Sequence, residues 1–66
     1  MENRIFLNKS IYEFKKIRYT IQAFGGICEV DIKEDSVYWI CIFSKCGFDL
    51  ERTIREFENY LISISN

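Results

Sequence analysis

The sequence predicts a single small α+β domain over residues 1–66, with its elements in the order strand, helix, strand, strand, helix. Three observations predict this class. Two segments carry apolar residues at spacings of three and four, the period of an amphipathic helix. A third segment alternates apolar and charged residues, as a half-buried strand does, and an apolar run rich in β-forming residues follows it. A chain of 66 residues has room for one small hydrophobic core.

The N-terminal part predicts a short strand over residues 4–7 and a helix over residues 10–24. Ser10 and Glu13 have the spacing of a capping box, in which each side chain accepts a hydrogen bond from a backbone N–H at the helix start. The two glycines at 25–26 end this helix, since glycine adopts the left-handed conformation at no steric cost. The apolar stripe of the helix consists of Phe14, Ile17, Ile21 and Phe24.

The middle of the chain predicts a β-hairpin formed by residues 27–33 and 37–43, with a polar turn between them. The first strand is half-buried, whereas the second is apolar at every position. A loop of even length places Tyr38, Ile40 and Ile42 on the face opposite to the shared apolar face, and an odd loop reverses the two faces. The cross-strand partners expected for the even loop are Ile32 and Val37, Val30 and Trp39, and Cys28 and Cys41.

The C-terminal part predicts a second helix over residues 50–63, which Asp49 caps at its N-terminus. Its apolar stripe consists of Leu50, Ile54, Phe57, Leu61 and Ile64. The right-handed path of a strand-helix-strand unit and the hairpin together favour a sheet with the third strand in the middle. Both helices then cover one face of a three-stranded sheet, as in a ferredoxin-like fold that lacks its last strand.

Composition and charge exclude several classes of protein. Nine Lys and Arg against ten Asp and Glu give a net charge of −1, which removes the uniformly basic signature of an autonomous nucleic-acid binder. The apolar run at 37–43 is much shorter than the roughly 20 residues of a membrane span. Residues 1–9 lack the apolar stretch of a signal peptide, so we expect a cytoplasmic protein with no membrane partner.

The polar residues predict no enzyme, cofactor or metal site. The chain has no histidine, the usual general base, and its hairpin carboxylates have the pattern of a solvated strand face. Cys28, Cys41 and Cys46 are odd in number and lack paired spacing, which predicts reduced thiols and no zinc site. One thiol-based alternative stays open, because Cys46 precedes a helix N-terminus that lowers a thiol pKa.

The candidate contact surface is the sheet face that the helices leave uncovered. The third strand is apolar on both faces, and a contiguous apolar patch on a small protein marks a site of protein contact. Alternatively, the termini or the loop at 44–48 fold over this face. The first strand is also an edge, to which a second copy or a peptide can add a strand. The predicted partner-binding residues are Phe6, Tyr38, Ile40 and Ile42.

Charge is distributed unevenly along the chain. Residues 1–26 carry five basic and two acidic groups, a net +3, whereas residues 27–66 carry four and eight, a net −4. The basic residues of the first part are candidate contacts for a peptide, an acidic partner or RNA, and the alternative is an ordinary solvated helix face. The predicted weak basic patch consists of Arg4, Lys9, Lys15, Lys16 and Arg18, and the candidate contacts for a peptide or an acidic partner are Lys9, Lys15, Lys16 and Arg18.

Two segments carry a family resemblance, namely Leu7-Asn8-Lys9-Ser10-Ile11-Tyr12 and Glu56-Phe57-Glu58-Asn59-Tyr60-Leu61-Ile62. In these segments the chain resembles HxsD, the small protein of the His-Xaa-Ser system. Proteins of that family are encoded beside radical S-adenosylmethionine enzymes that modify a ribosomally made peptide. The resemblance therefore implies an accessory or peptide-recognition protein rather than a catalyst. Our hypothesis for its mechanism is that the open face docks on the maturase, while the exposed edge or the basic first helix holds the precursor peptide. The alternative is a self-associating ferredoxin-like module, a homodimer, that binds a small ligand or RNA.

Overall fold

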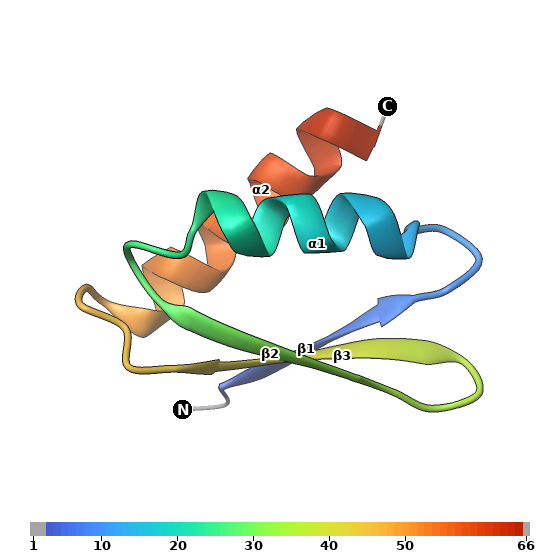
Figure 1. The fold of residues 1–66 in the computed structure, drawn as a ribbon, viewed down its shortest axis with the longest axis horizontal. Helices are drawn as coiled ribbons and strands as arrows, with labels where there is room; N and C mark the ends of the chain where they lie inside the picture. Colours follow the sequence, from blue (N-terminus) through green and yellow to red (C-terminus); the bar gives the residue numbers. More distant parts are fainter. Residues whose placement is uncertain (1–2, 66) are drawn as a thin grey trace.

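The computed structural model describes residues 3–65 as two layers, a sheet and a pair of helices that lie on one of its faces (Figure 1). The elements are β1 (Arg4–Asn8), α1 (Phe14–Ala23), β2 (Glu29–Glu34), β3 (Tyr38–Ser44) and α2 (Leu50–Ser65). The three strands have the order β1-β3-β2, and both neighbouring pairs are antiparallel. The predicted fold class and the central place of the third strand are confirmed.

The register of the β2–β3 hairpin differs from the predicted one by four residues. Ile32 pairs with Cys41 and Val30 pairs with Phe43, so the predicted partners Val37 and Trp39 were wrong. The predicted pairing of Cys28 with Cys41 was wrong for the same reason. Because a shift of four is even, it moves no side chain to the other face of the sheet.

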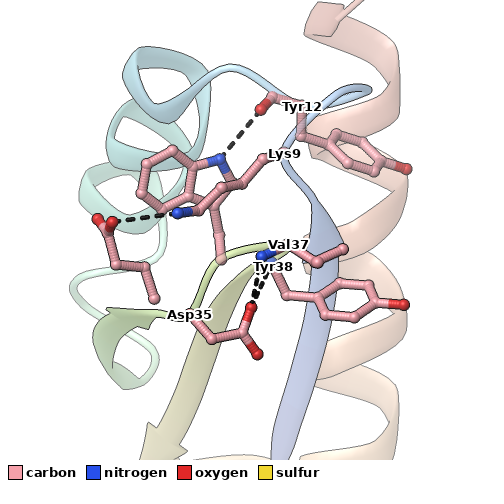
Figure 2. Close-up of polar contacts among 7 residues, drawn as sticks. Lys9, Tyr12, Asp35, Val37 and Tyr38 are labelled. Atoms are coloured by element: carbon pink, nitrogen blue, oxygen red, sulfur yellow. Dashed lines mark hydrogen bonds and ion pairs between the residues drawn. The ribbon is translucent and has the colours of Figure 1, made fainter.

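Asp35 explains the different register, because its side chain builds a tight turn. Its Oδ1 accepts hydrogen bonds from the backbone N–H groups of Val37 at 2.8 Å and Tyr38 at 2.7 Å (Figure 2). The Asp35 N–H donates to the Tyr38 carbonyl at 3.0 Å, which closes the hairpin. The turn therefore lies at residues 35–38, so Lys33 and Glu34 remain in the ladder opposite Ile40 and Trp39.

The same two bonds lower the pKa of the Asp35 carboxyl from its ordinary value of 3.8, with the Tyr38 N–H as the larger cause and the Val37 N–H as the next. Hydrogen bonds to the charged form favour that form. A lowered pKa in the folded state means that this contribution to stability is present above the ordinary value. It is lost as the pH falls through the lowered pKa.

The first helix begins at Phe14, four residues later than predicted. The Asn8 side-chain oxygen accepts hydrogen bonds from the Ser10 N–H at 2.8 Å and from the Ser10 hydroxyl, and the Asn8 carbonyl accepts from the N–H groups of Ile11 and Tyr12. Glu13 is the N-cap and makes no side-chain capping bond. The predicted capping box was therefore wrong, because local bonds from Asn8 form a turn in place of a helix start.

The second helix begins as predicted. Asp49 caps it, since its Oδ2 accepts a hydrogen bond from the Arg52 N–H at 2.9 Å. The helix continues to Ser65, two residues beyond the predicted end. Both helices also bury a threonine that the apolar stripes do not include, and each hydroxyl donates to a carbonyl of the preceding turn. These residues are Thr20 and Thr53.

The core lies between the sheet and the helices, and Phe57 is at its centre. The Phe57 ring is fully buried and makes edge contacts with the rings of Phe43 at 5.0 Å and Phe24 at 5.4 Å between centroids. These contacts join α2 to the sheet and to the C-terminal end of α1. The buried apolar residues are Leu7, Ile17, Phe24, Cys28, Cys41, Phe43, Phe57 and Leu61.

Cys28 and Cys46 form a disulfide, with Cα atoms 4.1 Å apart, so the prediction of reduced thiols was wrong for this pair. The register brings them together, because the last β2–β3 pair is Glu29 with Ser44 and each cysteine lies just beyond it. Cys41 is a free, buried thiol, and burial raises its pKa from 9.0 to about 12. At neutral pH this thiol is protonated and unreactive.

Candidate contact surface on the open face of the sheet

The open face is the side of the sheet opposite to α1 and α2 (Figure 1). Alternation along the strands places the even-numbered side chains of β1 and β3 on this face, because the odd-numbered ones Leu7, Cys41 and Phe43 are buried under the helices. All four predicted partner-binding residues therefore lie on the open face. They are Phe6 of β1 and Tyr38, Ile40 and Ile42 of β3.

These four side chains form one apolar band, which we call the open-face band. Phe6 pairs directly with Ile40 across the β1–β3 ladder, and its ring meets the Tyr38 ring edge to face at 5.7 Å between centroids. Phe6 is 52% exposed and Tyr38 is 37% exposed, so the two rings are accessible to a partner. Within the described residues, neither helix lies over the band (Figure 1).

Ile40 and Ile42 are only partly buried, and their neighbours explain why. Ile40 lies between Phe6 on β1 and Lys33 on β2, and Ile42 lies between Arg4 and Asp31. Side chains at directly opposite positions lie side by side on one face, so these neighbours flank the two isoleucines. The band is therefore bordered by Phe6 and Arg4 on β1 and by a charged side, Lys33 and Asp31, on β2.

The charged side of the face carries both signs. Asp31 and Lys33 follow each other along β2 on this face, and Glu29 forms an ion pair with Lys45 at 3.7 Å. Mixed charges beside an apolar centre are the usual arrangement of a protein contact surface, in which the polar rim fixes orientation. The sequence contained this rim as the alternating residues of β2, but their position beside Ile40 and Ile42 depends on the register.

The predicted basic contact residues lie away from the open face. Lys9 forms an ion pair with Glu34 at 3.1 Å and lies over the Trp39 ring at 4.7 Å from its centroid (Figure 2). Lys15, Lys16 and Arg18 belong to α1, in the layer opposite to the open face. Their role as contacts for a peptide or an acidic partner stays a prediction.

A second feature, which the sequence did not reveal, is a pair of surface hollows beside Phe48. One has a volume of about 410 Å³ and lies between Ile27 and the first turns of α2, and the other has about 390 Å³ and lies beside Ser44 and Cys46. Phe48 lines both hollows and is 71% exposed. The polar residues of the first hollow are already engaged, since Asp49 caps α2 and Arg52 pairs with Glu56 at 3.3 Å.

Across residues 3–65, no three side chains of His, Cys, Asp or Glu lie close enough together to hold a metal ion. Neither α1 nor α2 has the length and apolar character that a membrane-spanning helix needs.

The chain matches no protein-family model, and neither the curated proteins nor the solved structures contain a significant match to it.

Proposed function

We propose that this chain is a non-catalytic binding protein whose open-face band docks onto a partner protein. One observation supports the proposal most strongly, namely that the central strand keeps apolar side chains on the face that α1 and α2 leave uncovered. Exposed aromatic residues such as Phe6 and Tyr38 are typical binding hot spots. Removing the band from water on docking gives the main favourable term, and the charged rim selects the orientation.

The resemblance to HxsD supports a specific partner, a radical S-adenosylmethionine maturase that modifies a ribosomally made peptide. In this proposal the maturase covers the open-face band. The precursor peptide contacts the basic side of α1 through an acidic segment of its own. Lys15 and Arg18 are exposed on this helix and can pair with such a segment. The chain contributes binding and orientation, and the maturase carries out the chemistry.

A titration with a radical S-adenosylmethionine maturase and its ribosomally made precursor peptide tests the proposal. We expect saturable binding to the maturase, and Ile40→Asp should weaken it by about tenfold or more because a carboxylate is placed in the contact centre. Ile62→Asp is the matched control, because Ile62 is an exposed apolar residue of α2, in the other layer. Absence of binding to both molecules, or equal binding by Ile40→Asp and the wild type, would contradict the proposal.

A further inference from the structure

The outer edge of β1 carries backbone groups that point away from the sheet. The Phe43 N–H donates to the Asn3 carbonyl at 2.8 Å, and the Lys9 N–H donates to the Val37 carbonyl at 3.0 Å. In an antiparallel ladder these bonds alternate along the strand, so the odd-numbered residues of β1 bond to β3. The N–H and C=O of Phe6, the central residue of β1, therefore point outward, where residues 3–65 provide no further strand.

The two edges of the sheet differ in their protection against pairing. At the β2 edge, four of six residues are charged, which are Glu29, Asp31, Lys33 and Glu34. Charges on an edge strand oppose the addition of another strand. By contrast, the three central residues of β1 are Ile5, Phe6 and Leu7, with no charge among them. The β1 edge is therefore the one suited to pairing.

β1 is also complementary to itself. When two copies align antiparallel about Phe6, each Phe6 faces the other, and Ile5 of one copy faces Leu7 of the second. The two Phe6 residues can then exchange both of their outward backbone hydrogen bonds. The Ile5 and Leu7 side chains meet on the helix side of the sheet, and the Phe6 rings meet on the open face, so apolar contacts form on both faces.

We propose that the chain forms a two-fold symmetric dimer in which the β1 strands of two copies pair antiparallel about Phe6. The two sheets join into one sheet of order β2-β3-β1-β1-β3-β2. The two open-face bands become one continuous apolar surface, with the Phe6 rings at its middle. The net charge of −1 per chain gives little repulsion between the copies. A protein or peptide partner of the proposed function still has access to the open face.

Sedimentation equilibrium of the wild type and of charged variants tests the dimer. We expect a reversible dimer for the wild type. Phe6→Lys and Phe6→Glu should each weaken it by about tenfold or more, because like charges directly opposite each other in a sheet are destabilising. An equimolar mixture of the two variants should form a heterodimer. Lys33→Glu, at the other edge, should leave dimerisation unchanged.

An isotope-filtered nuclear Overhauser experiment on a mixture of labelled and unlabelled wild-type chains gives a second readout that needs no variant. The non-hydrogen-bonded pair of Ile5 with Leu7 brings its Cα atoms closest, so we expect an intermolecular contact between their Hα protons. A wild type that stays monomeric up to millimolar concentration overturns the proposal. A dimer that survives Phe6→Lys, or that Lys33→Glu abolishes, also overturns it. Ile40→Asp tests partner docking separately, since Ile40 lies on β3, away from the edge.

Discussion

Replacing Phe57 by alanine is expected to lower the free energy of unfolding by about 3–5 kcal/mol, the usual cost of deleting an aromatic ring from a core. Phe57 is fully buried between Phe24 and Phe43, so the change removes contacts from α1, from the sheet and from α2 itself. A domain of this size rarely has more than about 3–5 kcal/mol of stability from its core. The variant should therefore be largely unfolded at room temperature.

Urea unfolding followed by circular dichroism measures this effect. Phe48→Ala is the matched control, because Phe48 is exposed in the loop before α2 and its loss should change stability by about 0.5 kcal/mol or less. If Phe57→Ala and Phe48→Ala have the same stability, the described packing of α2 against the sheet is wrong.

Reduction of the Cys28–Cys46 disulfide is expected to lower the free energy of unfolding by about 2–4 kcal/mol. The bond closes a loop between residues 18 apart in the sequence and joins the start of β2 to the loop before α2. Such a link restricts the unfolded chain, and the effect depends on the length of the closed loop. A small core makes this contribution a large share of the total stability.

Urea unfolding with and without a reducing agent checks the disulfide. The double variant with Cys28→Ala and Cys46→Ala should be less stable than the oxidised wild type and insensitive to the reductant. Alkylation of the oxidised, folded protein should leave Cys41 unmodified, since that thiol is buried and its pKa is raised to about 12. A wild type whose stability does not change on reduction would contradict the disulfide.

The elements that the sequence predicted well are those with a long apolar repeat. The apolar stripe that includes Phe57 and Leu61 correctly predicted α2 and its buried face. Burial of such a stripe outweighs the conformational preferences of single residues. The central place of β3 followed from connection rules, which depend on element order alone. The same rules placed both helices on one face, and hence left the other face open.

The features that the sequence did not predict depend on single side chains that bond to nearby backbone. Hydrogen bonds accepted by Asn8 make α1 begin later than predicted, and those accepted by Asp35 set a hairpin register that differs from the predicted one. The spacing of apolar residues does not reveal such bonds. The Cys28–Cys46 disulfide follows from that register and was missed with it. The open-face band was still predicted, because an even shift in register leaves every side chain of β3 on its original face.

The most direct test of the open face compares Trp39→Asp with Ile40→Asp in urea unfolding. These neighbours on β3 point to opposite faces, and Trp39 packs against Phe14 at 5.0 Å between centroids, while its Nε1–H donates to the Tyr12 carbonyl at 3.1 Å. Trp39→Asp should therefore cost about 3–5 kcal/mol, as loss of a large packed ring does. Ile40→Asp should cost about 1 kcal/mol, the span of strand preference on an accessible face. Equal and large losses for both variants would show that the chain covers Ile40 itself, and would contradict the open face.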